Sequence, residues 1–190
     1  MFKKIKIRFI NYLREKLFPK NKNFINVEIL QSSNVSIDCI IGEYTYIGNN
    51  CTITKSIIGR YCSIANNVSI GIGEHDISKI STSSLFYEKP YETLTKLAPC
   101  LIGNDVWIGT NCVIRRGVKI GDGAVIGANS FVNKDVPDFA VVAGIPAKVI
   151  KYRFSFSKIE LIKDSDWWYK NINEAHELIV ILNESQYETI

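Results

Sequence analysis

The chain has 190 residues, of which 46% are hydrophobic and 22% are charged, and its formal net charge is +4. This composition is typical of a globular domain, and no run approaches the roughly 18–20 continuous apolar residues of a membrane span. Most of the positive charge lies in the first 22 residues and the remainder is mildly acidic, so we expect no nucleic-acid partner.

Residues 1–24 are predicted to form a basic amphipathic helix followed by a linker. Ile5, Phe9 and Leu13 are spaced to share one face of this helix. No apolar stretch follows the basic residues, so the pattern differs from that of a secretory signal. Such a helix either caps the adjoining domain or lies on an anionic membrane through residues 1–20. The expected location is the cytoplasm, with the inner face of the membrane as the alternative.

An aliphatic side chain recurs every six positions over residues 25–152, with one five-residue step and one interruption. The series is Ile29, Val35, Ile41, Ile47, Ile53, Ile58, Ile64, Ile70, Ile102, Ile108, Ile114, Ile120, Ile126 and Val132. Four positions after most of these stands a small or β-branched residue, and glycine often follows directly. A period of six fits neither an α-helix nor one long strand. It fits a short strand and a turn, three of which close a triangular coil.

This hexapeptide pattern resembles that of the left-handed parallel β-helix proteins, a recognised exception to right-handed crossovers. We therefore predict an all-β fold of roughly four to five coils, stacked about 4.8 Å apart. Cys39, Cys51, Cys62 and Cys112 fall on the small inward position, where a thiol behaves as a small hydrophobic group. Five cysteines without a C-x-x-C pair favour a reducing setting over a disulfide framework or a zinc ribbon.

The repeat is interrupted once, over residues 74–100, which we predict to leave the β-helix as an excursion loop. Insertions of this kind in repeat proteins often build the functional site. His75 stands where the chain leaves the coil. The other histidine, His176, falls in a C-terminal helical extension over residues 153–190, which contains a Trp-Trp pair. His75 is therefore the candidate for acid–base chemistry.

The loop resembles that of the xenobiotic acetyltransferases, such as the type B chloramphenicol and streptogramin acetyltransferases. That family has glycine, asparagine and histidine followed six residues later by serine-threonine, and Ser81 and Thr82 keep this spacing. The segments IGNDVWIGTNCVI, GDGAVIGAN, VNKDVP and AGIPAKVIKYRF are similar both to this family and to sugar O-acetyltransferases. Glu74 replaces the usual asparagine, and Ile145 replaces the asparagine of a glycine-asparagine-proline turn. Sugar O-acetyltransferases are therefore the better match.

The resemblance implies an acetyl-CoA-dependent O-acetyltransferase that modifies a sugar hydroxyl, with surface polysaccharide biosynthesis as the expected setting. It also implies direct transfer in a ternary complex, with His75 as the general base, because a neutral imidazole suits that role at neutral pH. The acceptor pocket of the family lies between two subunits of a homotrimer. Glu74, Asp76 or a backbone carbonyl are the alternatives for the group that orients the imidazole.

Matching motifs imply a set of contacts to coenzyme A along the coils and no metal. These residues are Trp107, Thr110, Ala128, Asn133, Lys134, Lys148, Lys151 and Arg153. The acceptor is expected to meet loop residues and aromatic residues of the early coils. These residues are Tyr44, Tyr46, Ser81, Thr82, Phe86 and Tyr87. Solvated surface charge or plain turn packing is the alternative reading for each.

Four other functions share this fold or these residues. An antibiotic acetyltransferase and an amino-sugar N-acetyltransferase are the close alternatives. A γ-type carbonic anhydrase is excluded because it needs three histidines on one metal, and the repeats contain only His75. A non-enzymatic binding or scaffold protein predicts no thermal stabilisation by acetyl-CoA, whereas a specific coenzyme A site must stabilise the folded state.

Overall fold

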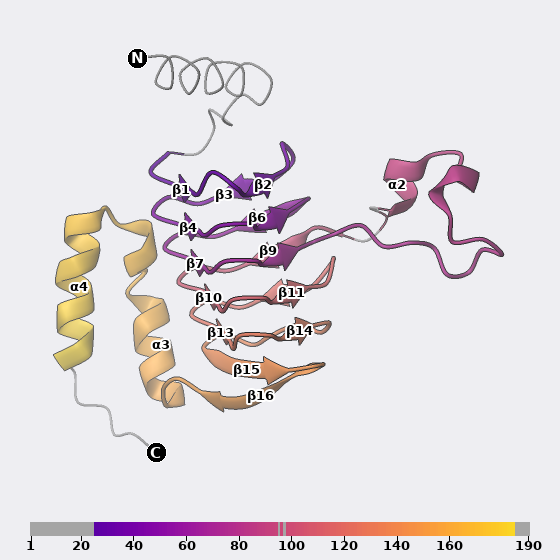
Figure 1. Ribbon diagram of the computed structural model, residues 1–190. Coiled ribbons are helices and arrows are strands. Elements are labelled where there is room, and N and C mark those ends of the chain that lie inside the picture. The colour runs from indigo at the N-terminus through magenta and orange to yellow at the C-terminus, as the bar shows by residue number, and fades with distance from the viewer. Residues whose placement is uncertain (1–24, 95, 97, 185–190) are drawn as a thin grey trace, which may run out of the picture.

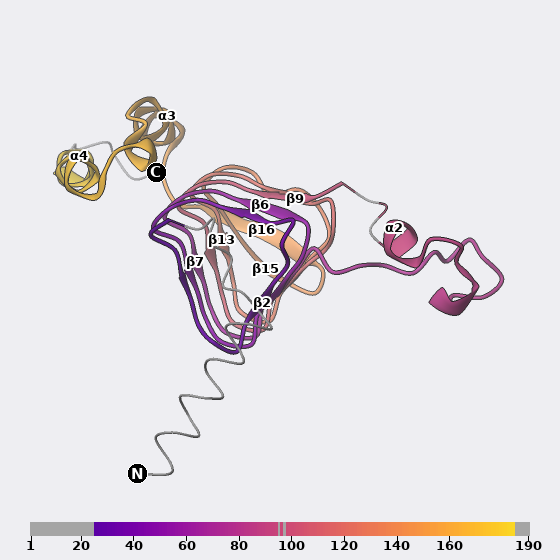
Figure 2. The ribbon, with the colours of Figure 1, turned by 90° about the horizontal axis from the view of Figure 1, so that it is seen from above.

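A computed structural model describes residues 25–94, 96 and 98–184 as a parallel β-solenoid of triangular cross-section (Figure 1, Figure 2). The helix expected over residues 1–24 lies outside the described residues. Three narrow sheets form the sides of the prism, a loop projects from one corner, and helices pack at another (Figure 2). Within the described ranges, no helix has both the length and the apolar character needed to cross a bilayer.

The three sheets are called face 1, face 2 and face 3, in the order in which each coil visits them. Face 1 has the order β1 (Glu28–Ile29), β4 (Tyr46–Ile47), β7 (Ser63–Ile64), β10 (Trp107–Ile108), β13 (Val125–Ile126), β15 (Ala140–Gly144) and β16 (Ala147–Tyr152). Face 2 has the order β14 (Phe131–Val132), β11 (Val113–Ile114), β8 (Ser69–Ile70), β5 (Thr52–Ile53) and β2 (Asn34–Val35). Face 3 has the order β12 (Lys119–Ile120), β9 (Cys100–Ile102), β6 (Ser56–Ile58) and β3 (Ile40–Ile41).

Strands one turn apart pair in parallel, and among the described strands only β15 and β16 pair in an antiparallel hairpin. The prediction of a left-handed parallel β-helix is confirmed. The stack has about six turns, which is more than the four to five expected from the hexapeptides. The difference arises partly because β15 continues face 1 beyond the last hexapeptide and adds a level that the six-residue period does not mark.

The aliphatic residue of each repeat points into the prism, as its period predicts. Ile47, Ile64, Ile108 and Ile126 have no exposed surface at all. The five cysteines are also buried, and none forms a disulfide. Because consecutive turns stack these layers directly, the inward residues form one continuous hydrophobic core, and burial of apolar surface stabilises the fold.

The corner between face 3 and face 1, called corner 3–1, is covered by the C-terminal helices. These are α3 (Phe156–Asp164), the short η2 (Trp167–Tyr169) and α4 (Ile172–Glu184). Trp167 and Trp168 are buried between these helices and the prism. The ring of Tyr61 lies 5.1 Å from that of Trp167, and its hydroxyl donates to the Lys170 carbonyl (3.2 Å). The extension is thus anchored to the prism by aromatic packing.

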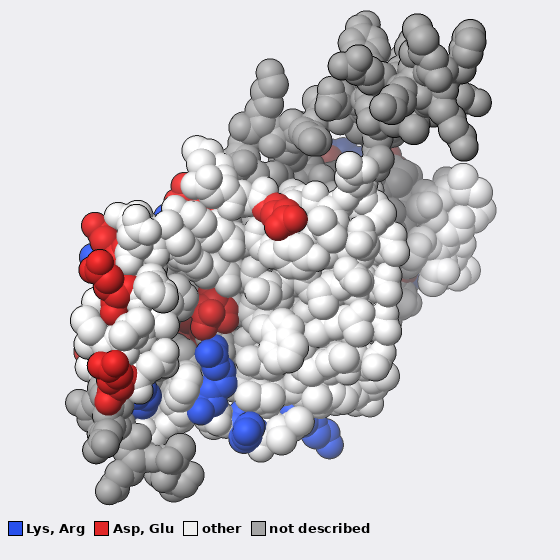
Figure 3. Space-filling model, turned by 60° about the vertical axis from the view of Figure 1, so that its left-hand side comes forward, with Lys and Arg blue, Asp and Glu red and all other residues white. Residues whose placement is uncertain are grey.

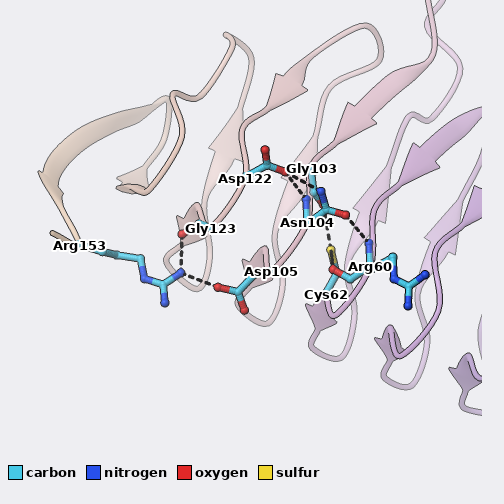
Figure 4. Close-up of polar contacts among 8 residues, drawn as sticks. All are labelled: Arg60, Cys62, Gly103, Asn104, Asp105, Asp122, Gly123 and Arg153. Atoms are coloured by element: carbon cyan, nitrogen blue, oxygen red, sulfur yellow. Dashed lines mark hydrogen bonds and ion pairs between the residues drawn. The ribbon is translucent and has the colours of Figure 1, made fainter. Parts of the chain in front are cut away.

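A ladder of polar side chains follows the same corner from turn to turn (Figure 4). The Arg60 N–H donates to the side chain of Asn104 (2.9 Å). The backbone and side-chain amides of Asn104 donate to Asp122 (2.6 and 3.0 Å), and the Asp122 N–H donates to Asp138 (3.0 Å). These bonds satisfy turn N–H groups that have no strand partner, so the polar backbone of the corner is paired without an additional sheet.

Candidate active site

The excursion loop leaves the prism at the corner between face 2 and face 3, called corner 2–3, and extends away from it (Figure 1). It carries the short helices η1 (Ser84–Phe86) and α2 (Pro90–Leu94) and returns to β9. Gly71 begins the exit with a φ of +66°. A Cβ at this position would lie 2.3 Å from the Thr54 carbonyl oxygen. The loop therefore leaves where only glycine fits.

His75 is exposed on the loop and is oriented by a backbone carbonyl. Its Nδ1 lies 2.5 Å from the carbonyl oxygen of Thr82. A carbonyl oxygen only accepts hydrogen bonds, so in the neutral imidazole Nδ1 carries the proton and Nε2 keeps its lone pair. This contact selects the backbone carbonyl among the three orienting groups that the sequence left open. The chemical result is an exposed nitrogen base.

Tyr87 lies inside the loop, although the sequence assigned it to acceptor binding. Its side chain is buried, and its hydroxyl donates to the Thr82 carbonyl (3.0 Å). The same hydroxyl accepts from the backbone N–H of Asp76 (3.0 Å). Its ring centroid lies 6.3 Å from that of His75. The tyrosine thus joins the two ends of the segment that carries the imidazole.

Glu74 pairs with Arg115, a residue that the sequence analysis missed. Arg115 Nε and Nη2 donate to the two carboxylate oxygens at 2.8 and 2.7 Å, and this pairing raises the pKa of the guanidinium. Arg115 belongs to the turn after β11, one level below the loop exit. The sequence did mark Glu74, because it replaces the usual asparagine of the loop. It gave no indication that Arg115, 41 positions away, would be the partner of Glu74.

The remaining predicted loop residues belong to the same excursion loop as His75. The side chains of Thr82 and Phe86 are exposed, and Phe86 exposes 73% of its surface. Ser81 is half-buried, and its hydroxyl accepts from the Ser83 N–H (3.2 Å). The loop that carries the base therefore also exposes an aromatic ring and a hydroxyl group.

Tyr44 and Tyr46 do not join these loop residues within one chain. Tyr44 stacks on Tyr61 at corner 3–1, with ring centroids 4.8 Å apart, and it packs beside Arg60. Tyr46 points outward from β4 on face 1, in register with Ser63. Tyr44 is therefore packed against other residues of its own corner. Tyr46 lies on an exposed surface of face 1, away from the corner that carries the loop.

The residues predicted to border coenzyme A are spread over all three corners and face 1. Thr110 and Ala128 lie one turn apart at the corner between face 1 and face 2, called corner 1–2, where Thr110 Oγ1 donates to the Asn66 carbonyl (2.8 Å). Asn133 and Lys134 follow β14 at corner 2–3, and Lys134 is exposed. The two pairs are therefore separated by the width of face 2.

Trp107 stands on the outer surface of face 1 and is 56% exposed. It lies in register with Ser63 and Val125, and together with Asp105 and Arg153 these residues line a shallow depression of about 450 Å³. A large exposed indole beside such a depression is available to pack against a bound molecule.

Basic side chains gather at the end of the stack formed by the β15–β16 hairpin (Figure 3). Lys148 and Lys151 of this hairpin are exposed. Arg153 differs, because its Nη1 contacts the Asp105 carboxylate (3.0 Å) and donates to the Gly123 carbonyl (2.7 Å; Figure 4). Burial raises the pKa of Asp105, and the Arg153 guanidinium partly opposes that rise. Arg153 is thus engaged in holding the corner.

One chain therefore does not assemble the whole set of predicted site residues. His75 and its neighbours project from corner 2–3, whereas Thr110 and Ala128 lie at corner 1–2 and Trp107 lies on face 1. Among the described residues, no group of three or more His, Cys, Asp or Glu side chains could hold a metal ion. The chemistry available on this chain is that of a base beside an aromatic and hydroxyl-rich loop.

Comparison with known proteins identifies the family. Residues 99–134 match the bacterial transferase hexapeptide family (six repeats). The chain is 40% identical over 155 residues to a probable macrolide acetyltransferase of Lysinibacillus sphaericus, covering 76% of this chain and 83% of that protein. It is 41% identical over 143 residues to a chloramphenicol acetyltransferase of Klebsiella aerogenes, covering 70% and 68%. The chain belongs to the hexapeptide-repeat acetyltransferases.

Other members of the hexapeptide-repeat acetyltransferases extend the comparison. A putative lipopolysaccharide biosynthesis O-acetyl transferase, WbbJ of Escherichia coli K12, is 36% identical over 124 residues, which cover 65% of this chain and 60% of that protein. The chain spans 60% of a chloramphenicol acetyltransferase of Morganella morganii. A Vibrio cholerae hexapeptide-repeat acetyltransferase solved with acetyl coenzyme A superposes with a TM-score of 0.55 at 28% identity, covering 76% of each chain. Acetyl-CoA is the co-substrate of this family.

Proposed function

We propose that this acetyltransferase moves the acetyl group of acetyl-CoA to a hydroxyl of a sugar, in the biosynthesis of a surface polysaccharide. The observation that carries the proposal is the hydrogen bond from His75 Nδ1 to the Thr82 carbonyl, which leaves Nε2 as an exposed base. A neutral imidazole is well matched to removing a hydroxyl proton during attack.

In the proposed reaction the acceptor oxygen attacks the thioester carbonyl carbon while its proton passes to Nε2 of His75. The carbon–sulfur bond then breaks, and the departing thiolate of coenzyme A takes the proton back from the imidazolium. Backbone N–H groups near the thioester stabilise the negative oxygen that forms in between. Atoms and charge balance without a covalent enzyme intermediate.

The cysteines support direct transfer. A covalent acetyl-enzyme would need an exposed and ionisable nucleophile beside the base. The five thiols are buried inside the prism, and burial raises the pKa of Cys62 to about 12. Because the thiols are enclosed in the prism, none of them can reach a bound thioester, and His75 would act on the acceptor directly.

A homotrimer is part of the proposal because the site is incomplete on one chain. In a trimer of parallel prisms, the projecting loop of one subunit reaches the corner 1–2 residues of the next. The loop carries apolar side chains that no part of its own prism covers, since Ile77, Ile80 and Leu85 are at least 88% exposed. Face 3 also presents Ile40 and Ile57 outward. Both surfaces suit burial against neighbouring subunits.

Within that assembly, coenzyme A would lie along the coils at the subunit boundary. The pantetheine would pass Thr110 and Ala128, and the thioester would lie beside Trp107. Asn133, Lys134, Lys148 and Lys151 would meet the nucleotide end, where lysines pair with phosphates. Thermal stabilisation by coenzyme A tests this arrangement and excludes a mere scaffold, because specific binding to the folded state must raise the melting temperature.

A sugar acceptor is favoured by two observations. The lipopolysaccharide-related protein is among the relatives, and Glu74 with its Arg115 partner replaces the asparagine of the antibiotic-modifying loop. Antibiotic acetylation is the second candidate, because the Klebsiella aerogenes chloramphenicol acetyltransferase and the probable macrolide acetyltransferase share 41% and 40% identity with this chain. An amino-sugar N-acetyltransferase would use the same base on an amine.

A thiol-release assay with acetyl-CoA tests these acceptors together. Nucleotide sugars and oligosaccharides form one arm, chloramphenicol, a macrolide and a virginiamycin form the second, and amino sugars form the third. We expect turnover in the first arm that falls at least about 100-fold in His75→Ala, as for loss of a general base. Turnover only in the second arm would replace the sugar assignment, and an unchanged rate in a folded His75→Ala protein would end the role of His75.

Membrane association through residues 1–20 is a separate part of the proposal. A basic amphipathic segment would hold the enzyme at the inner face of the membrane, close to lipid-linked saccharides. Co-sedimentation with anionic liposomes of the full chain and of residues 23–190 is the test. Equal sedimentation of both proteins would remove the membrane contact and leave a capping role for this segment.

A further inference from the structure

The hydroxyl of Tyr87 connects two backbone groups on either side of the segment that follows His75. It donates to the Thr82 carbonyl and accepts from the Asp76 N–H, both at 3.0 Å. The carbonyl that receives this bond is the one that receives the proton of His75 Nδ1. One side-chain oxygen therefore ties the residue after the histidine to the group that orients the histidine ring.

The burial of Tyr87 restricts the position of its hydroxyl and so stabilises these two hydrogen bonds. The side chain is 6% exposed although the loop around it projects into solvent, and Phe86 directly before it is 73% exposed. The Lys79 ammonium lies 6.0 Å above the ring, within the range of a cation–π contact. A buried ring has few alternative rotamers, so its hydroxyl holds a fixed position relative to the two backbone groups.

We infer that Tyr87 is a positioning residue that fixes the tautomer of His75, an inference that rests on the proposed function for its catalytic consequence. Free histidine favours the tautomer with the proton on Nε2, which would occupy the nitrogen that must act as the base. The Thr82 carbonyl reverses this preference by accepting from Nδ1, and Tyr87 holds that carbonyl in place. Removal of the hydroxyl frees the carbonyl to rotate and leaves the Asp76 N–H without its acceptor.

Nitrogen-15 NMR of the imidazoles tests the inference without any assay of activity. The chain contains only two histidines, and a His176→Gln variant assigns their signals. At a pH where the ring is neutral, we expect the native protein to show His75 protonated on Nδ1. In Tyr87→Phe we expect the signals to move toward the tautomer protonated on Nε2. Native protein already in the Nε2–H form, or an unchanged tautomer in the variant, would overturn the inference.

Kinetics provide the second readout, with Tyr61→Phe as the matched control. Tyr61 also donates its hydroxyl to a backbone carbonyl, that of Lys170, but it does so at corner 3–1. We expect Tyr87→Phe to lower kcat about tenfold, a loss typical of a misoriented catalytic group, with both KM values unchanged. We expect Tyr61→Phe to keep kcat. Equal losses in the two variants, or a rise in KM alone, would contradict positioning.

The two readouts separate this inference from the proposed function. If His75→Ala keeps its activity, the proposed base is wrong, yet the NMR comparison of native protein and Tyr87→Phe still stands. If the tautomer is the same in both proteins while His75→Ala is inactive, the base is retained and the role of Tyr87 is rejected. Melting temperatures of the native protein and both tyrosine variants establish that folded proteins are compared.

Discussion

Glu74 and Arg115 join the stem of the excursion loop to the turn after β11 through two parallel hydrogen bonds. Arg115 Nε and Nη2 lie 2.8 and 2.7 Å from the two carboxylate oxygens. The side chains are 36% and 45% exposed, so solvent screens the pair and its contribution to folding is below about 1 kcal/mol. Its geometry nevertheless fixes the residue directly before His75, because a paired carboxylate and guanidinium restrict each other's rotation.

Arg115→Gln is therefore expected to affect turnover more than stability. The variant should lower kcat several-fold, because the loop stem can then shift relative to the prism, while the melting temperature changes little. Lys119→Gln, which removes an exposed charge from the next strand, is the control and should leave kcat intact. The exchange Glu74→Arg with Arg115→Glu should recover part of the activity. Equal kcat in Arg115→Gln and the native enzyme would show that the pair does not position the loop.

Gly71 and Gly73 differ in what an added methyl group would meet. At Gly71 the backbone has a φ of +66°, and a Cβ would lie 2.3 Å from the Thr54 carbonyl oxygen. At Gly73 a Cβ would lie 3.1 Å from the Leu94 carbonyl oxygen. We expect Gly71→Ala to lower the free energy of unfolding by about 2–4 kcal/mol through strain and overpacking, and Gly73→Ala by less than about 1 kcal/mol.

Urea unfolding of both alanine variants measures this difference. The pair is well matched, because both glycines flank the exit of the same loop and both gain one methyl group. A Gly71→Ala protein as stable as Gly73→Ala would mean that the loop leaves the prism along a different backbone path from the one described.

Arg153 and Lys151 are expected to respond differently to loss of charge. Arg153 is held by the Asp105 carboxylate and the Gly123 carbonyl, so Arg153→Gln should cost about 1–3 kcal/mol of folding free energy and leave the KM for acetyl-CoA unchanged. Lys151 is exposed on the basic hairpin, so Lys151→Gln should raise that KM and leave stability unchanged. A raised KM in Arg153→Gln with native stability would restore the sequence-based assignment of Arg153 to coenzyme A.

The fold was predictable because its information is local and repeated. Each turn repeats the same six-residue pattern, which places Ile47, Ile64 and Ile108 in the core. Few folds are compatible with a hydrophobic period of six residues. The count of turns was underestimated where β15 replaces hexapeptides with a longer strand. The repeat also predicted that the cysteines point into the prism, because a position for a small inward side chain recurs in each turn.

The site was predictable only in part, because a loop has no period. The position of His75 at the loop exit and the resemblance of the loop selected this residue. The Thr82 carbonyl that orients it is a backbone group and leaves no trace in the sequence. Tyr87 was assigned to the acceptor because aromatic residues suit sugars, whereas its hydroxyl is engaged by the loop backbone. Tyr44 was predicted to bind the acceptor, whereas its ring stacks on Tyr61 at corner 3–1. This contact joins residues of consecutive turns, so it becomes visible only when the turns are stacked in their correct register.

Cys62 gives a pH dependence with a definite sign. Its side chain is 1% exposed, and burial raises the pKa of the thiol from 9.0 to about 12. The folded protein therefore holds this proton more tightly than the unfolded chain. The resulting stabilisation is complete below about pH 9 and is lost as the pH rises toward 12, at up to about 1.4 kcal/mol per pH unit.

Cys62→Ala isolates this contribution, because alanine keeps a small inward side chain and has no proton to lose. At pH 8 we expect the variant to be less stable than the native protein, since it loses the thiol and its bond to the Gly103 carbonyl (3.1 Å). Between pH 9 and pH 10.5 the gap in unfolding free energy should narrow, because only the native protein must keep a buried thiol protonated in order to fold. Urea titrations of both proteins under reducing conditions measure the gap at each pH. A gap that stays constant over this range would show that the Cys62 thiol titrates alike in the folded and unfolded chains, and that the inward position is open to water.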